Sequence, residues 1–153
     1  MKVAVGSDHA GYRLKKEIVR FLSNEQIQFK DFGVFSLDRA DYPDIGVQVG
    51  EAVANKEFDR GILICASGIG MSITANKVPG IRAALCSNVE CAQLSREHND
   101  SNILVLGERV TSVASALEIL RTWLSTDFSG KERYAMRIRK ISEIEKRYNG
   151  GES

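Results

Sequence analysis

The segment Cys65-Ala66-Ser67-Gly68-Ile69-Gly70 combines a thiol, a hydroxyl and two glycines within six residues. Glycines let the backbone approach a ligand closely, and free N–H groups at the start of a helix can hold an anion. The positive end of a helix also favours the thiolate form of a nearby cysteine. We therefore expect Cys65 to act as a base or a nucleophile, although many buried cysteines serve only as small hydrophobic side chains.

A carboxylate and an imidazole follow the first apolar run, in Ser7-Asp8-His9-Ala10-Gly11. Asp8 has an ordinary explanation as a helix cap, and His9 as a surface residue. Their position at the end of a predicted strand favours a functional explanation, because ligands of open parallel sheets bind beyond the carboxyl ends of the strands. We predict that both residues border the site.

Four more residues could bind an anion or transfer a proton, and each also has a structural explanation. His98 precedes Asn99 at the end of a predicted helix, where a histidine is commonly a favourable cap. Arg109 follows the last predicted strand, where arginines are usually just solvated. Arg133 and Arg137 are four residues apart on one helical face. Guanidinium groups suit phosphate oxygens, but a charged helix face would show the same spacing.

Several familiar sites are excluded by residues that are missing. The glycine loop lacks the lysine of a P-loop, and Ile73 stands where a dinucleotide-binding fingerprint has its third glycine. Phosphocysteine phosphatases carry an arginine six residues after the cysteine, and this chain has Met71 there. Cys86, Cys91 and His98 are too loosely spaced for a zinc site. We expect no metal and no other cofactor, and we interpret Cys86 and Cys91 as buried apolar residues.

The composition is that of an ordinary globular domain. The 153 residues fit one domain, with 43% hydrophobic and 27% charged residues. A net charge of +1 gives no electrostatic case for nucleic acid or a membrane surface. Three cysteines are an odd number, which favours a reducing compartment, and we expect a cytoplasmic location. We expect neither a signal peptide nor a membrane span.

Short β-branched runs alternate with longer helical patterns along the chain. The alternation predicts an α/β fold, a Rossmann-like open parallel five-stranded sheet with helices on both faces in three layers. We expect strands over 2–6, 27–29, 59–65, 81–86 and 102–106. We expect helices over 12–24, 42–56, 68–77, 89–98, 112–125 and 131–148, and a disordered tail over 149–153, so that residues 1–148 form a single domain.

Six segments, in this order, share their pattern with a known family. They are GSDHAG at 6–11, DYPD at 41–44, RGILICASGIGMS at 60–72, ANKVPGIRAALC at 75–86, REHND at 96–100 and LGERV at 106–110. Together they resemble the type B ribose-5-phosphate isomerase family, which also includes hexose-6-phosphate isomerases. The resemblance extends from residue 1 to about residue 147 and implies the same open α/β sheet.

The resemblance implies a reaction and a base. The chain would interconvert ribose 5-phosphate and ribulose 5-phosphate through a cis-enediol, as in the pentose phosphate pathway. Cys65 would move the proton, because the family's other branch uses a glutamate where this chain has Met71. Ser67 would assist the base or the sugar with its hydroxyl. The enediolate oxygen would be held by the backbone of Ala66, Gly68, Ile69 and Gly70.

The resemblance also implies where the rest of the sugar phosphate binds. His98 would open the furanose ring with Asp8 nearby, and Asn99 would contact the sugar. The phosphate would be bound by His9, Arg109, Arg133 and Arg137. Members of the family form homodimers or homotetramers, in which His98, Asn99 and the arginines reach the site from the partner subunit.

The chain departs from the family pattern in three places. Many members have Gly-Thr where this chain has Ala66-Ser67, and many have histidine where it has Tyr134. The segment from Lys131 carries one extra residue. Two alternatives stay open: a hexose 6-phosphate isomerase, acting for instance on allose or galactose phosphate, and a non-catalytic phosphosugar-binding module.

Overall fold

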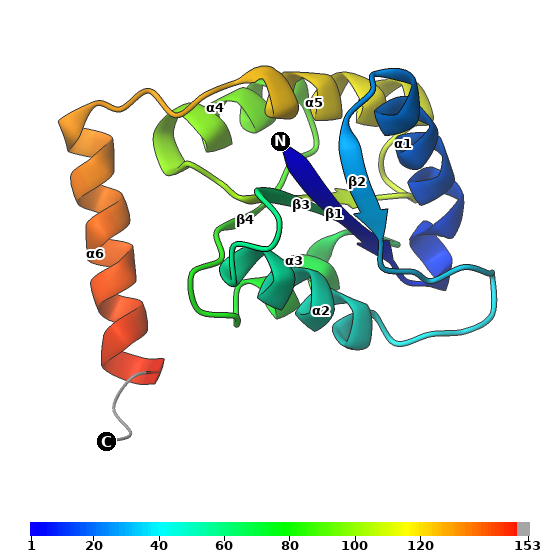
Figure 1. Cartoon of the computed structure of the whole chain (residues 1–153), viewed down its shortest axis with the longest axis horizontal. Coiled ribbons are helices and arrows are strands. Elements are labelled where there is room, and N and C mark those ends of the chain that lie inside the picture. The colour runs from blue at the N-terminus through cyan, green and yellow to red at the C-terminus, as the bar shows by residue number, and fades with distance from the viewer. Residues whose placement is uncertain (150–153) are drawn as a thin grey trace.

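The computed structural model describes residues 1–149 and shows one parallel sheet between two layers of helices (Figure 1). The strand order is β2-β1-β3-β5-β4, and every neighbouring pair is parallel. The strands are β1 (Lys2–Ser7), β2 (Gln28–Asp31), β3 (Arg60–Cys65), β4 (Ala83–Leu85) and β5 (Ile103–Gly107). The predicted Rossmann-like α/β fold is confirmed.

The helices match the predicted segments to within two residues at each end. They are α1 (Tyr12–Asn24), α2 (Tyr42–Ala54), α3 (Ile69–Ala75), α4 (Val89–Asn99), α5 (Val113–Ser125) and α6 (Glu132–Asn149). A short 3-10 turn, His9–Gly11, was not predicted. Asn149 ends α6 although it was predicted to begin the disordered tail, and positions 150–153 of that tail lie outside the described residues.

The central strand β3 is apolar on both faces, and this explains the two core clusters of the molecule. Ile62 and Ile64 are fully buried on the side covered by α1, α4 and α5. Leu63 is buried, and Cys65 nearly so, on the opposite side, with residues from α2 and α3. Consecutive apolar residues are expected of a parallel strand that is covered on both sides. The alternation points the side chain of Cys65 toward α2 and α3.

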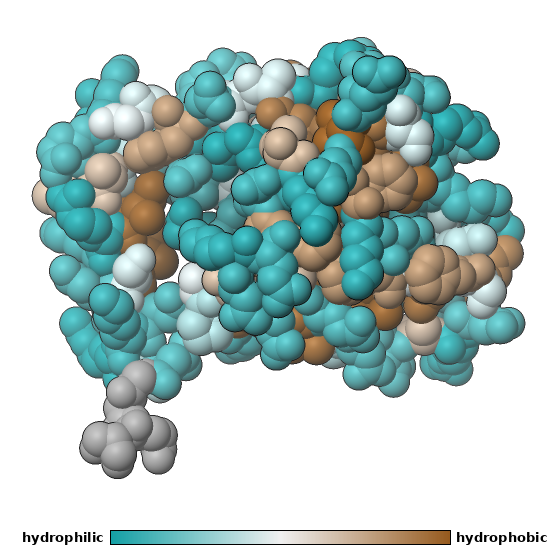
Figure 2. All heavy atoms as spheres, viewed as in Figure 1, coloured by the Kyte–Doolittle hydropathy of each residue, from teal (hydrophilic) through white to brown (hydrophobic). Residues whose placement is uncertain are grey.

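Helix α6 stands beside the body of the molecule and does not enter the core (Figure 1). None of its residues from Glu132 to Asn149 is buried. Its apolar residues face the body across a groove of about 570 Å³, where Ile141 and Ile144 of α6 lie opposite Ile81. Figure 2 shows this hydrophobic strip on α6. A hydrogen bond of 2.9 Å from the Gly80 amide to Glu145 Oε1 also joins the helix to the body.

No helix among the described residues is long and apolar enough to cross a membrane.

Candidate active site

Cys65 lies at the carboxyl end of the central strand, between the ends of β1 and β5. The register pairs Ser7 of β1 with Ile64, and Gly107 of β5 with Cys65. Asp8 therefore follows β1 directly beside the cysteine, and its amide donates to the Ile64 carbonyl at 3.3 Å. The structure thus brings Asp8 and Cys65 together at the edge where the sequence predicted a site.

The loop after Cys65 is held by backbone bonds to the segment that follows β5. The Cys65 carbonyl accepts from the Glu108 amide, and the Ala66 carbonyl accepts from the Arg109 amide, each at 2.9 Å. Arg109 is exposed and directly follows this contact. The segment that carries Arg109 therefore lies against the loop of the cysteine within a single chain.

Gly68 turns the chain into α3 with a φ of +83°, in the left-handed region. A Cβ atom there would lie 2.5 Å from Leu85 Cδ1 and 3.2 Å from the Leu106 backbone carbon. Ser67 Oγ accepts from the Ile69 amide at 3.2 Å. Within residues 1–149, the amides of Ser67, Gly68 and Gly70 have no hydrogen-bond acceptor. These three N–H groups can therefore bind an anionic oxygen.

Asp8 and His9 both border a cleft of about 440 Å³ that is completed by residues 39–44. Asp8 is buried, and its Oδ1 accepts from the Gly11 amide at 3.0 Å, so it also caps the 3-10 turn. The Nδ1 atom of His9 lies 3.1 Å from both the amide nitrogen and the carbonyl oxygen of Ala40. This contact orients the imidazole and leaves Nε2 as the nitrogen available to a ligand.

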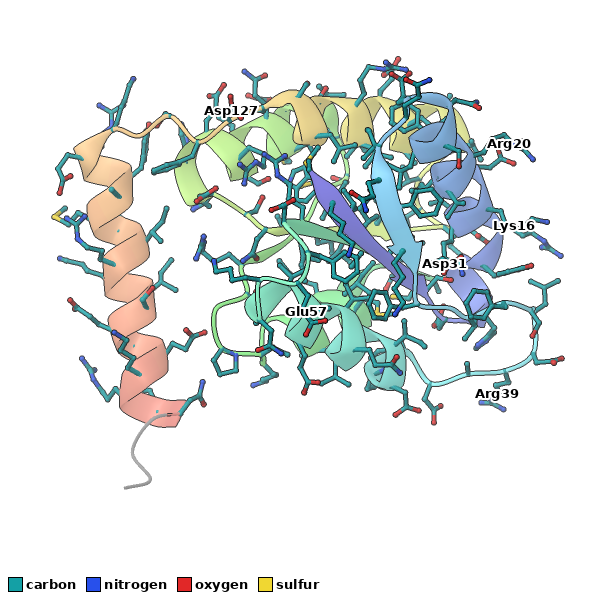
Figure 3. The ribbon with its side chains drawn as sticks, viewed as in Figure 1. Lys16, Arg20, Asp31, Arg39, Glu57 and Asp127 are labelled. Atoms are coloured by element: carbon teal, nitrogen blue, oxygen red, sulfur yellow. The ribbon has the colours of Figure 1, made fainter. Side chains whose placement is uncertain are left out.

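The cleft depends on the loop between β2 and α2, for which the sequence predicted no structure. Figure 3 shows Asp31 at the end of β2, and Arg39 on the loop that leads to α2. Asp31 accepts two hydrogen bonds, of 2.7 and 2.9 Å, from Nζ of the buried Lys15. Lys15 Nζ also donates to the Val34 carbonyl. The buried lysine thereby anchors the loop that ends at Ala40, the partner of His9.

Tyr42, the first residue of α2, borders the loop of Cys65 although it had no predicted role. Its ring lies over Gly70, where an added Cβ would be only 2.5 Å from Tyr42 Cζ. Glu108, whose amide donates to the Cys65 carbonyl, had no predicted role either. Both contacts join segments far apart in the chain, so no local pattern could have revealed them.

The thiol of Cys65 is largely covered in the single chain. The residue is 4% exposed and belongs to the apolar cluster under α2 and α3, which includes the fully buried Met71. Met71 thus contributes packing at the position where the glutamate branch of the resembled family has its carboxylate.

The structure does not bring His98, Asn99, Arg133 or Arg137 to Cys65 within one chain. Helix α4 starts beyond the carboxyl end of β4 and returns to the start of β5. His98 and Asn99 therefore lie near the amino ends of the strands, away from Cys65. Arg133 and Arg137 lie on α6, at the side of the molecule (Figure 1). His98, Arg133 and Arg137 form a second cluster around Tyr134, whose ring is stacked on that of His98 with centroids 4.2 Å apart.

The other two cysteines differ from one another. Cys86 is buried as expected, and burial raises the pKa of its thiol to about 11. Cys91 is exposed, so the prediction that it is a buried apolar residue was wrong. In the part of the chain that the structure describes, no three His, Cys, Asp or Glu side chains are grouped so as to hold a metal.

Comparison with known proteins finds close relatives over almost the whole chain. Residues 3–141 match the family model described as Ribose/Galactose Isomerase. Ribose-5-phosphate isomerase B of Escherichia coli is 47% identical over 148 residues, covering 97% of this chain and 99% of the relative.

Solved structures agree with this relationship. Ribose-5-phosphate isomerase B of Clostridium thermocellum is 55% identical, with a TM-score of 0.96 over 97% of this chain and all of the other. The Mycoplasma genitalium enzyme, solved with bound ribulose-5-phosphate, is 37% identical, with a TM-score of 0.91 over 95% of this chain and 96% of the other. The similarity therefore covers the sheet, the cysteine loop and the following helices together.

Proposed function

Because the chain belongs to the ribose/galactose isomerase family, we propose that it interconverts ribose 5-phosphate and ribulose 5-phosphate. It is an aldose–ketose isomerase in which Cys65 transfers the proton. The observation that carries this assignment is the juxtaposition of the Cys65 thiol, the Asp8 carboxylate and the unpaired amides of Ser67, Gly68 and Gly70 at one sheet edge.

The reaction moves one proton between carbons and one between oxygens. Sγ of Cys65, as thiolate, removes the proton from C2 of the open-chain aldose, and the C2 electrons form the enediolate with negative charge on O1. The amides of the loop hold that oxygen, an interaction commonly worth about 3 kcal/mol in the transition state. The thiol then returns the proton to C1, while a proton moves from O2 to O1 with help from the Ser67 hydroxyl.

The remaining residues open the sugar ring and hold its phosphate. His98 acts as general acid and base in ring opening, with Asp8 nearby, and Asn99 contacts the sugar. The phosphate is bound by His9, Arg109, Arg133 and Arg137. The guanidinium and imidazole groups neutralise the phosphate at one end of the site. The sugar is thereby held with its C1 and C2 atoms at the other end, near the thiolate.

A complete site requires two copies of the chain. His98, Asn99, Arg133 and Arg137 lie away from Cys65 in the single chain, so a partner subunit must supply them. We infer a homodimer with shared active sites, either alone or as half of a tetramer. The three free cysteines suit a reducing compartment, so a cytoplasmic location is part of the proposal. The proposed reaction would place the protein in the pentose phosphate pathway. The proton transfer uses no metal and no nucleotide.

Proton exchange in heavy water tests the role of Cys65. The wild-type protein should exchange the C2 proton of ribose 5-phosphate and produce ribulose 5-phosphate, and Cys65→Ala should do neither. Cys91→Ala, which removes an exposed cysteine, is the matched control and should keep full activity. Full activity in Cys65→Ala would refute the mechanism. Ligand binding without turnover by the wild type would favour a binding module instead, and faster turnover of allose or galactose 6-phosphate would favour a hexose phosphate isomerase.

Co-expression of two inactive variants tests the shared site. A mixed dimer of Cys65→Ala and His98→Ala chains has one site with both defects and one site with none. Random pairing should therefore restore roughly a quarter of wild-type activity. Mixed dimers that are isolated with two different tags and remain inactive would show that each site is built from one chain.

A further inference from the structure

Tyr134 lies at the centre of the cluster formed by α6 and the end of α4. Its ring is stacked on His98, with centroids 4.2 Å apart and planes 19° from parallel. Arg133 Nη2 donates to the Tyr134 phenol oxygen at 3.0 Å. The guanidinium carbons of Arg133 and Arg137 lie 4.7 and 5.9 Å from the centre of the same ring. One aromatic side chain therefore contacts all three charged or titratable residues.

The backbone places Tyr134 over His98. The Ser129 amide donates to the Glu97 carbonyl at 3.2 Å, which joins the segment before α6 to the last turn of α4. Tyr134 then lies in the first turn of α6, where its amide donates to the Lys131 carbonyl at 3.0 Å. The connection fixes the start of α6 against the residue next to His98.

The contacts limit side chains that would otherwise move freely. Tyr134 is half-buried, whereas Arg133 and Arg137 are exposed. A long arginine side chain loses much rotamer freedom when a ligand fixes it, and stacking on an aromatic ring removes part of that freedom in advance. Stacking likewise restricts the orientation of the imidazole.

We propose that Tyr134 is a positioning residue that presents His98, Arg133 and Arg137 to the sugar phosphate as one preformed unit. This inference rests on the proposed function, because His98 is assigned there to ring opening and the arginines to phosphate binding. Tyr134 acts through these three residues and makes no contact with the reacting atoms. The tyrosine, at a position where many members of the family have histidine, supplies both a stacking face and a hydrogen-bond acceptor.

Three substitutions separate these contributions. Tyr134→Leu removes the ring and the phenol, and kcat/KM for ribose 5-phosphate should fall about tenfold, the size of one aromatic stacking contact. Tyr134→Phe keeps the ring and loses only the bond to Arg133, so it should recover most of kcat and retain a raised KM. Tyr148→Leu, on the same helix at a 78% exposed tyrosine, is the matched control and should match the wild type.

Proton exchange separates the effect on His98 from the effect on the arginines. Ribulose 5-phosphate carries its phosphate on O5 and cannot close a furanose ring, so exchange of its C1 proton in heavy water needs Cys65 but no ring opening. At saturating substrate, Tyr134→Leu should slow the conversion of ribose 5-phosphate more than it slows this exchange. Equal losses would contradict a role in orienting His98.

NMR of the dimer tests the cluster without any activity measurement. The chain has two histidines, His9 and His98, so their ring protons are readily distinguished. Stacking on Tyr134 should shift the His98 protons upfield, and Tyr134→Leu should return them downfield while His9 stays unchanged. Tyr134→Phe should keep the upfield shift.

The outcomes distinguish this inference from the proposed function. An active wild type with unchanged kinetics and unchanged His98 resonances in Tyr134→Leu overturns the inference and leaves the proposed function intact. A wild type that turns over no sugar phosphate overturns both.

Discussion

The amide of Glu108 donates a hydrogen bond of 2.9 Å to the carbonyl oxygen of Cys65, so the segment after β5 holds the backbone of the proposed base. The side chain of Glu108 contacts a different element. Its Oε1 accepts from the Leu14 amide at 2.6 Å, in the first turn of α1. Gly11 precedes that helix and provides no side-chain cap. Glu108 therefore caps α1 from a distant part of the chain.

Glu108→Ala should lower the free energy of unfolding by about 1–2 kcal/mol, because the first turn of α1 loses its acceptor and a favourable negative charge. Glu108→Gln keeps a carbonyl oxygen and should lose less. Urea denaturation followed by circular dichroism measures both. Glu17→Ala, which breaks only a surface pair with Arg20 on the same helix, is the control and should change stability by less than about 0.5 kcal/mol. Equal losses in Glu108→Ala and Glu17→Ala would contradict the capping role.

Gly107→Ala should disturb the loop of Cys65 directly. A Cβ atom at Gly107 would lie 2.5 Å from the carbonyl carbon and oxygen of Ser67, and backbone atoms cannot move aside as a flexible side chain can. The loop amides must shift, and we expect kcat to fall at least tenfold, since misplacing catalytic groups by about 1 Å commonly costs more than that. Gly50→Ala on α2 is the control, because its Cβ would approach only the side chain of Val78. Unchanged kcat in Gly107→Ala would show that the loop tolerates displacement.

Lys15→Met should destabilise the fold by about 3 kcal/mol, because it leaves the carboxylate of Asp31 without its buried cation. Lys15 is 1% exposed, and the salt bridge to Asp31 measures 2.7 Å. Adding Asp31→Leu to Lys15→Met removes the uncompensated charge and should restore part of the loss. Urea denaturation of the two single variants and the double variant gives the coupling. Simple additivity of the two single losses would contradict a direct pairing.

Alkylation should distinguish the two cysteines outside the site. Burial raises the pKa of Cys86 to about 11 from an ordinary value of 9.0, so this thiol stays protonated and unreactive at about pH 8.5. Cys91 is exposed and should react first. Mass spectrometry of the peptides that contain Cys86 and Cys91, in Cys65→Ala protein, measures the two alkylation rates. Comparable rates in the folded protein would contradict the burial of Cys86, and reaction in urea is the control.

The raised pKa of Cys86 also makes the free energy of unfolding depend on pH. The folded state binds the thiol proton more tightly than the unfolded state does. The stabilisation from this bound proton is therefore fully present below about pH 9 and is lost as the pH rises through about 11. Cys86→Val, which cannot ionise, should lose less stability than the wild type over this range. Parallel curves of unfolding free energy against pH for the two proteins would contradict the assignment.

The sequence predicted the sheet well where its signal was local. The consecutive apolar residues Ile62, Leu63 and Ile64 identified the central strand, and the alternation with helical patterns identified its parallel neighbours. The strand predicted over 81–86 was too long, because the Ile81 amide closes a turn onto the Val78 carbonyl at 3.1 Å. A turn of this kind depends on backbone pairing that apolar composition does not reveal.

The site was predicted only in part, for a physical reason. Asp8 and Cys65 could be placed together because adjacent parallel strands end at the same edge. The contacts of Tyr42 with Gly70 and of Lys15 with Asp31 depend on how a loop folds over the sheet, which no spacing in the chain records. The stacking of Tyr134 on His98 depends likewise on the path of the segment before α6.

Helix α6 has no buried residue between Glu132 and Asn149, whereas β3, which ends in Cys65, and β1, which ends just before Asp8, are almost wholly enclosed. A substitution on α6 therefore removes little from the free energy of folding, while one beside the thiol disturbs the packing of the whole sheet. Activity lost on substitution of Arg133, Tyr134 or Arg137 can therefore be ascribed to the proposed site rather than to unfolding of the sheet.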